Sequence, residues 1–124
     1  MKVLIVDDEE LTLMAIANKL SKEGYLTITA SDALEALTII KEEKPDLIIL
    51  DIMMPNISGL ELLNLIRYEF LKSIPAIFIS ALDQQEIIVS AKGLGANDFI
   101  IKPFKMEELL LRVKKLLAEV KEER

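Results

Sequence analysis

Five short runs of apolar residues recur along the chain, each separated from the next by a stretch of helical character. Four of the runs are almost wholly apolar and rich in Val and Ile, which is typical of parallel strands buried on both faces. The second run alternates instead, which indicates a strand nearer the edge of a sheet. Parallel strands need crossover helices, so we expect an α/β fold with a doubly wound parallel sheet. The expected strands are Lys2–Val6, Leu26–Ala30, Leu47–Leu50, Ala76–Ile79 and Asp98–Ile101.

The five helical stretches carry recognisable start and stop signals. Three of them begin with a capping residue that is followed three positions later by Glu. The last stretch, over 106–120, places its apolar residues in one continuous stripe. The expected caps are Asp32, Ser58 and Asp83, and the expected stops are Gly24 and Pro45.

The size of the chain fits one domain over residues 1–124, since domains typically run to about 100–150 residues. The longest apolar runs are far shorter than the roughly 18 residues of a membrane span. The first residues hold one Lys and a short apolar run that ends at acids, unlike a signal peptide. We therefore expect a cytoplasmic protein without membrane contact.

Composition excludes several kinds of site. The chain has no Cys, which rules out disulfides, thiolate metal sites and Cys nucleophiles. It has no His, which rules out imidazole bases, the usual zinc sites and a phosphohistidine on this chain. The net charge of −6 disfavours direct nucleic-acid binding, because the basic residues of the last helix are interleaved with Glu.

Polar residues stand where four of the five expected strands end. Asp7 and Asp8 follow the first strand, Asp51 the third, Ser80 the fourth and Lys102 the fifth. In open α/β sheets the functional crevice lies at the carboxyl ends of the strands. We therefore expect these five side chains to converge at one edge.

Such a group of residues suits phosphoryl transfer to a carboxylate. Three carboxylates repel one another, and a divalent cation with a nearby ammonium resolves that conflict. Oxygen ligands without His or Cys favour Mg²⁺ or Mn²⁺. A carboxylate can accept a phosphoryl group, and the reaction needs mainly positioning and charge neutralisation. Asp8 and Asp51 can hold the metal, Lys102 can neutralise the phosphate, and Ser80 can donate a hydrogen bond to it.

Each of these residues also has an ordinary structural interpretation. The pair Asp7-Asp8 can be a helix cap, Asp51 a turn residue, Ser80 a structural hydroxyl and Lys102 a loop lysine. Their joint placement at one predicted edge favours a shared site over four independent explanations.

Four ordered segments carry a family resemblance: VLIVDDEE, PDLIILDIMMPNISGLELL, PAIFISA and GANDFIIKPF. With them the chain resembles, over its whole length, the receiver domains of bacterial response regulators in the CheY-like superfamily. The resemblance implies a flavodoxin-like (βα)5 fold with five helices and strand order 2-1-3-4-5. It also implies a phospho-accepting signalling switch, rather than an enzyme, that assists its own phosphorylation and dephosphorylation.

The resemblance assigns the metal and phosphoryl ligands. Asp51 would be the phosphorylation site, and Asp8, Asp51 and the backbone carbonyl of Met53 would bind Mg²⁺ directly. Asp7 would act mainly through a metal-bound water. Lys102, joined to the next residue by a cis peptide bond, would contact the phosphoryl group.

The resemblance also assigns the switch and its partners. Ser80 would turn toward the phosphate and Phe99 would swing inward behind it, changing the surface of the fourth helix, fifth strand and fifth helix. The phosphoryl donor would be a histidine kinase or a phosphotransfer protein, and the receiver of the signal an output domain or effector protein. We expect a monomer or a phosphorylation-dependent homodimer. Asp98, Glu108 and Arg112 resemble residues used in such dimers, whereas the apolar trio 87–89 replaces a basic residue and can mark a partner surface.

Met53 and Leu82 stand at positions that are often polar in receivers. Neither side chain can orient an attacking water, so we expect an aspartyl phosphate on this chain to hydrolyse slowly.

Three other functions are compatible with a sheet of this kind. An aspartate-nucleophile phosphatase typically carries a second Asp two residues after the first, where this chain has Met53. A flavodoxin-like cofactor binder needs aromatic residues to flank a flavin, and the chain has six aromatics and no Trp. A receiver-like module that binds partners without being phosphorylated is hard to reconcile with the full set of polar residues.

Overall fold

Five strands alternate with five helices in the computed structural model, which describes residues 1–70 and 73–124. The strands are β1 (Lys2–Val6), β2 (Leu26–Ala30), β3 (Leu47–Asp51), β4 (Ala76–Ser80) and β5 (Asp98–Ile101). The helices are α1 (Glu10–Lys22), α2 (Ala33–Glu43), α3 (Gly59–Phe70), α4 (Gln85–Gly93) and α5 (Met106–Glu123).

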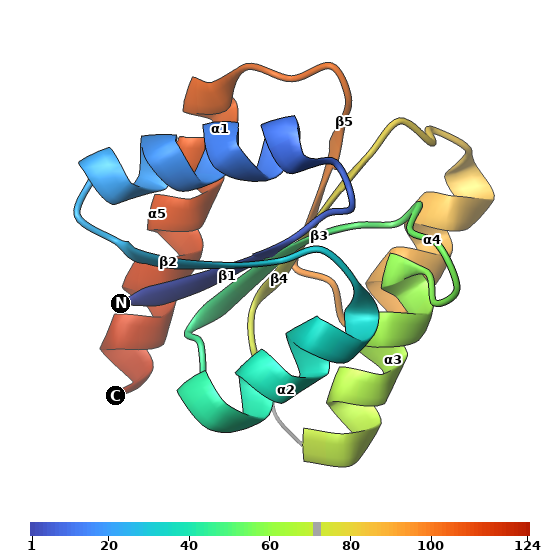
Figure 1. The fold of residues 1–124 in the computed structure, drawn as a ribbon, viewed down its shortest axis with the longest axis horizontal. Coiled ribbons are helices and arrows are strands. Elements are labelled where there is room, and N and C mark those ends of the chain that lie inside the picture. Colours follow the sequence, from blue (N-terminus) through green and yellow to red (C-terminus); the bar gives the residue numbers. More distant parts are fainter. Residues whose placement is uncertain (71–72) are drawn as a thin grey trace.

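The strands form one parallel sheet in the order β2-β1-β3-β4-β5, as the family resemblance implied. The alternating strand β2 lies at an edge of the sheet, which confirms the prediction from its pattern. Helices α1 and α5 cover one face of the sheet, and α2, α3 and α4 cover the other (Figure 1). The two chain ends lie close to the amino ends of the strands.

A separate hydrophobic core fills each side of the sheet. On β1, Val3 and Ile5 pack toward α1 and α5, whereas Leu4 and Val6 pack toward α2 and α3. Successive side chains of a strand point to opposite faces, so a strand covered on both sides must be apolar at every position. This is the physical origin of the continuous apolar runs in the sequence.

Two of the three predicted helix caps are confirmed. The side chain of Asp32 accepts a hydrogen bond from the Glu35 backbone N–H at 2.8 Å, and Ser58 Oγ accepts one from the Glu61 N–H at 3.2 Å. The prediction for Asp83 is wrong. Helix α4 begins one residue later than expected, because its first helical hydrogen bonds are accepted by the Gln84 carbonyl.

The predicted helix ends agree with the structure. Gly24 follows α1 with a φ of +95°, a conformation that glycine adopts without strain. Helix α2 ends at Glu43, and Lys44 takes a left-handed conformation before Pro45. Both expected stops therefore lie two residues beyond the last residue of the helix that they end.

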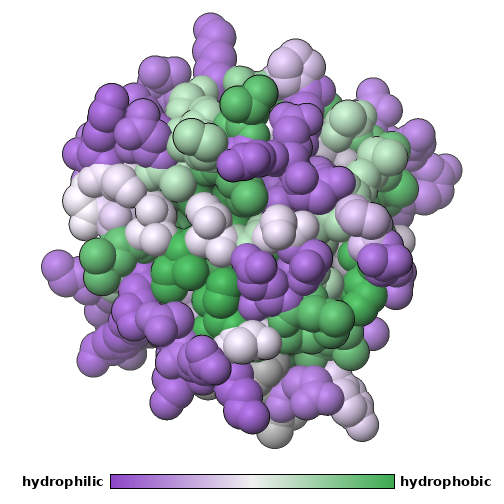
Figure 2. Space-filling view, in the orientation of Figure 1, coloured by the Kyte–Doolittle hydropathy of each residue, from purple (hydrophilic) through white to green (hydrophobic). Residues whose placement is uncertain are grey.

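Figure 2 shows hydrophilic residues around the outline of the molecule, with hydrophobic groups between them. No helix in the described parts of the chain has the length and apolar character that crossing a bilayer requires.

Candidate functional site

Buried polar side chains gather at the carboxyl ends of three neighbouring strands. Asp7 follows β1, Asp51 ends β3 and Ser80 ends β4, and these three are the buried polar residues of the described chain, with 3%, 7% and 0% exposure. Strands β3 and β4 each run one residue longer than predicted, so Asp51 and Ser80 belong to the sheet and are held by its pairing. The sheet therefore fixes the backbone of the site.

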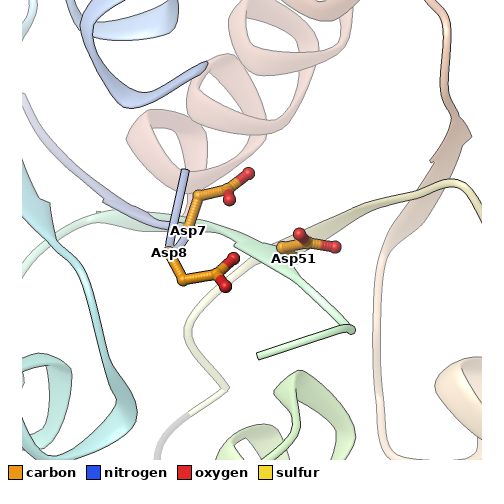
Figure 3. A group of neighbouring side chains, drawn as sticks. All are labelled: Asp7, Asp8 and Asp51. Carbon is orange, nitrogen blue, oxygen red and sulfur yellow. The ribbon is translucent and has the colours of Figure 1, made fainter. Parts of the chain in front are cut away.

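The carboxylates of Asp7, Asp8 and Asp51 form a cluster. One oxygen of each lies within 4.8 Å of the other two. Figure 3 shows Asp7 and Asp8, at the end of β1, beside Asp51. Because Asp8 is exposed, the cluster is open to water on one side. Hard oxygen donors from carboxylates, with room for water ligands, fit the preference of Mg²⁺.

Lys102 supplies the positive charge of the site. Its Nζ lies 3.4 Å from Asp7 Oδ2 and 3.4 Å from Asp51 Oδ2, so one ammonium bridges the two buried carboxylates. Burial works to lower the pKa of Lys102, but the charges of Asp51 and Asp7 outweigh it and raise the pKa above its usual value. Lys102 therefore stays charged at neutral pH.

Asp7 is an acid whose ionised form is electrostatically disfavoured. Burial raises the pKa of Asp7, and the charge of Asp51 adds to this effect. The Glu9 backbone N–H, which donates to Asp7 Oδ1 at 2.9 Å, and the Lys102 ammonium oppose it in part. The fold thus holds an acid where its ionised form is disfavoured, which is typical of functional sites.

Gly59 positions the segment next to Asp51 and was missed as a site residue by sequence reasoning. Its N–H donates to the Ile52 carbonyl at 2.8 Å, and a Cβ on Gly59 would lie 2.0 Å from the Asp51 carbonyl oxygen. Only glycine permits this approach of α3 to the end of β3. The sequence signal was a glycine directly after a cap, which we interpreted only as a helix start.

Two predicted switch residues lie on the neighbouring strands. The Ser80 hydroxyl accepts a hydrogen bond from the Leu82 N–H at 3.1 Å, and the Ser80 carbonyl accepts one from the Lys102 N–H at 2.8 Å. Phe99 of β5 is half-buried, with its ring centroid 6.3 Å from that of Phe78. The peptide bond between Lys102 and Pro103 is cis, as expected.

The Met53 backbone N–H donates to Asp51 Oδ1 at 3.3 Å, so the loop after β3 helps to orient the Asp51 carboxylate.

On the far side of Lys102 lies an apolar groove of about 590 Å³ between α1 and the loop after β5. Its walls include Leu11, Ala15 and Phe104, and Lys102 contributes to both the groove and the carboxylate cluster.

Comparisons with known proteins agree with this geometry. A family model described as the response regulator receiver domain matches residues 3–114. The alkaline phosphatase synthesis transcriptional regulatory protein PhoP of Bacillus subtilis is 41% identical over 116 residues, which cover 94% of this chain and 48% of PhoP. This chain thus spans about half the length of the curated relatives it matches.

Solved structures agree as well. A CheY-like response regulator receiver domain protein from Methanospirillum hungatei has a TM-score of 0.93 and 31% identity, covering 99% of this chain and 98% of that one. The response regulator TrrA of Thermotoga maritima, solved in complex with Mg²⁺-BeF, has a TM-score of 0.82 and 36% identity, covering 93% and 97%.

Proposed function

This chain belongs to the response regulator receiver domain family, and from that premise we propose that it acts over residues 1–124 as a phospho-accepting switch in which Asp51 takes the phosphoryl group. The observation that carries the proposal is the single ammonium of Lys102 between two buried carboxylates, beside a third carboxylate open to water. A site of this kind offers a nucleophile, a phosphate counter-charge and a cation site within one small volume.

The proposed donor is a phosphohistidine on a histidine kinase or phosphotransfer protein, or a small phosphodonor. A carboxylate oxygen of Asp51 attacks the phosphorus and forms an O–P bond. From phosphohistidine the P–N bond breaks, its electron pair goes to the imidazole nitrogen, and that nitrogen takes a proton from solvent. From acetyl phosphate a P–O bond breaks and acetate leaves with the electron pair. Lys102 moves from neutralising the carboxylates to neutralising the phosphoryl oxygens, so the chain assists its own phosphorylation without being an enzyme.

The cation site is assigned to the carboxylate cluster. Asp8, Asp51 and the backbone carbonyl of Met53 would hold Mg²⁺, or Mn²⁺, directly, and Asp7 would act mainly through a water. When bound, the ion supplies further positive charge for the phosphoryl oxygens. The support is the oxygen-only donor set on this chain and its spacing. TrrA, a relative in structure, was solved with Mg²⁺-BeF.

The switch begins at Ser80. A phosphoryl group brings roughly −1.5 to −2 charge and three strong acceptors. The Ser80 hydroxyl now accepts a hydrogen bond from the Leu82 N–H. On phosphorylation it turns to donate a hydrogen bond to the phosphoryl group, and the loop after β4 moves with it. Phe99, on the strand next to Ser80, fills the space that this movement opens. The phosphate thereby biases one of two arrangements of α4, β5 and α5.

The output surface on α4, β5 and α5 would contact an output domain, an effector protein or a second copy of the chain. Val89, Ile101 and Leu111 are exposed large apolar residues on these three elements. In the chain itself Arg112 pairs with both Asp98 and Glu108, so a homodimer that used these charges would have to exchange their partners.

The phosphodonor protein would dock on the groove between α1 and the loop after β5. The groove shares Lys102 with the acceptor site, and exposed Leu11 at its wall offers an apolar contact. Leu11→Glu should slow transfer from a phosphorylated histidine phosphotransfer protein and leave phosphorylation by acetyl phosphate unchanged. Equal slowing of both reactions would contradict this docking site.

The central test is intact mass after incubation with acetyl phosphate and Mg²⁺. The wild type should gain about 80 Da, one phosphoryl group, and lose this gain when EDTA replaces Mg²⁺ or when Asp51 is replaced in Asp51→Ala. An adduct that persists in Asp51→Ala would place the acceptor elsewhere. No adduct on the wild type after rapid quenching would favour a binding module that works without phosphorylation.

A further inference from the structure

Met53 is an exposed, oxidisable residue whose backbone contacts the proposed phospho-acceptor. The chain has five Met and no Cys, so thioethers are its sulfur groups. Met53 is 58% exposed, and its backbone N–H donates to Asp51 Oδ1 at 3.3 Å. Met14, on α1, is equally exposed at 60% and makes no such contact among the described hydrogen bonds.

Oxidation would change the polarity of this position. A peroxide transfers one oxygen to the Met53 sulfur: an S–O bond forms, the O–O bond breaks, the sulfur loses two electrons and the peroxide is reduced to water or an alcohol. A thioether is a weak hydrogen-bond acceptor. The sulfoxide is polar and accepts hydrogen bonds strongly, on a side chain of nearly the same length.

We propose that Met53 is a modification site for peroxides, and that its sulfoxide shortens the lifetime of the phosphoryl group on Asp51. This inference rests on the proposed function. In hydrolysis a water oxygen attacks the phosphorus, the P–O bond to Asp51 breaks, the carboxylate is restored and the proton passes to solvent or phosphate. Met53 and Leu82 offer this water no strong acceptor, whereas the sulfoxide does.

The expected effect is about a fivefold faster loss of the phosphoryl group, as one typical hydrogen bond made only in the transition state would supply. The experiment treats the wild type, Met53→Leu and Met14→Leu with hydrogen peroxide and locates each gain of about 16 Da by peptide mapping. The proteins are then phosphorylated with acetyl phosphate and Mg²⁺, the donor is removed, and loss of the adduct is followed by intact mass.

Treated wild type and treated Met14→Leu should lose the phosphoryl group faster than untreated protein, and treated Met53→Leu should not. Methionine sulfoxide reductase should restore the slow rate. Met53→Gln, which carries a polar acceptor without oxidation, should lose the group faster in untreated form.

Three results would overturn this inference and leave the proposed function standing. They are no oxygen on Met53 under conditions that oxidise Met14, an unchanged phosphoryl lifetime with Met53 oxidised, or an equally shortened lifetime in treated Met53→Leu. If the untreated wild type never gains the phosphoryl adduct, the proposed function fails and this inference falls with it.

Discussion

Asp7 and Asp8 are neighbours in sequence but occupy different electrostatic environments. Asp7 is buried and shares the Lys102 ammonium with Asp51, whereas Asp8 faces solvent. The buried carboxylates of Asp7 and Asp51 therefore repel each other with little screening, whereas water screens the charge of Asp8.

Asp7→Asn should stabilise the metal-free protein and weaken its function. The amide keeps an oxygen for the Glu9 N–H and removes one buried negative charge, so we expect a gain of about 1 kcal/mol, or a few degrees in Tm. Mg²⁺ affinity should fall about 10- to 100-fold, as for other residues that act on a metal through water. Thermal unfolding in EDTA measures the gain in stability, and phosphorylation at a series of Mg²⁺ concentrations measures the loss of Mg²⁺ affinity. Asp8→Asn is the control for stability, with a smaller change in Tm; a lower Tm for Asp7→Asn would show that its contact with Lys102 dominates.

The close approach of Gly59 to the Asp51 backbone leads to a steric prediction at the same site. Gly59→Ala must displace the backbone of Asp51, because the new Cβ would lie 2.0 Å from a carbonyl oxygen. We expect a loss of about 2–3 kcal/mol in unfolding free energy, typical of an overpacked site, together with slower phosphorylation. Chemical denaturation measures the first effect and intact mass the second.

Gly93 provides the matched control for this substitution. It ends α4, and a Cβ there would have no heavy atom within 4 Å. Gly93→Ala should be neutral or stabilising by up to about 1 kcal/mol, because alanine has the higher helix propensity. Equal losses for the two variants would contradict the steric role of Gly59.

The convergence of the acids and Lys102 could be predicted from the sequence because parallel strands bring their carboxyl ends to one edge. The approach of Gly59 to Asp51 could not, since it depends on where α3 meets β3 in space. The hydrogen bond from the Leu82 N–H to the Ser80 hydroxyl was also beyond prediction, because a buried hydroxyl has several partners within reach.

At the scale of elements, Arg67 joins three parts of the fold. From α3 its guanidinium donates to the Ile74 carbonyl at 2.7 Å, just before β4, and to the carbonyls of Leu94 and Gly95 at 3.4 and 2.9 Å, just after α4. The C-terminal end of α4 is thus held to α3, whereas among the described residues no side chain caps its N-terminal end. Any displacement of α4 on phosphorylation should therefore begin at its N-terminal end.

Arg67→Gln should release the turn at 94–97. Hydrogen bonds from charged donors each contribute about 1.5–3 kcal/mol, so we expect a loss of about 2 kcal/mol or more in unfolding free energy and faster amide exchange over these residues. Hydrogen–deuterium exchange with mass spectrometry measures the local effect. Arg112→Gln, which removes one partly exposed ion pair within α5 and one between α5 and β5, should cost less than about 1 kcal/mol and leave 94–97 unchanged.

The strands were easier to predict than the helix ends. Burial on both faces gave the central strands β1, β3 and β4 continuous apolar runs, and the predicted strand boundaries erred only where Asp51 and Ser80 extend β3 and β4 as polar residues. The cap at Asp83 failed because Asp32, Ser58 and Asp83 carry the same local signal, and the contacts of the loop after β4 decide where α4 starts. The Arg67 contacts with Leu94 and Gly95 join segments more than 25 residues apart, which no local pattern reports.

At the scale of the whole molecule, Asp46 binds a residue near each end of the chain, Lys2 and Arg124, at the amino edge of the sheet. It accepts a hydrogen bond from the Lys2 backbone N–H at 2.8 Å and also pairs with Arg124. Partial burial works to raise the pKa of Asp46, but the Lys2 N–H and the Arg124 charge outweigh it and hold the pKa below its usual value.

A lowered carboxyl pKa stabilises the fold above the unfolded value of about 3.9, and the contribution is lost as pH falls through the folded pKa. Asp46→Asn, which keeps an acceptor for Lys2, should therefore be less stable than the wild type by about 1 kcal/mol at pH 7. The difference should shrink between pH 7 and a strongly acidic pH below the folded pKa, where the carboxyl is protonated. Urea unfolding at both pH values measures it, with Glu43→Gln as an exposed-pair control; a constant difference would mean that the charge contributes nothing.

The parallel sheet gives the molecule a polarity that can be used directly. Its strands all run from the edge that holds both chain ends to the edge that holds Asp51 (Figure 1). A tether at either terminus would therefore leave the acceptor edge facing away from its support. The chain can be anchored to a sensor chip or joined to a fluorescent reporter by either end, while phosphodonors and metal ions reach the opposite edge from solution.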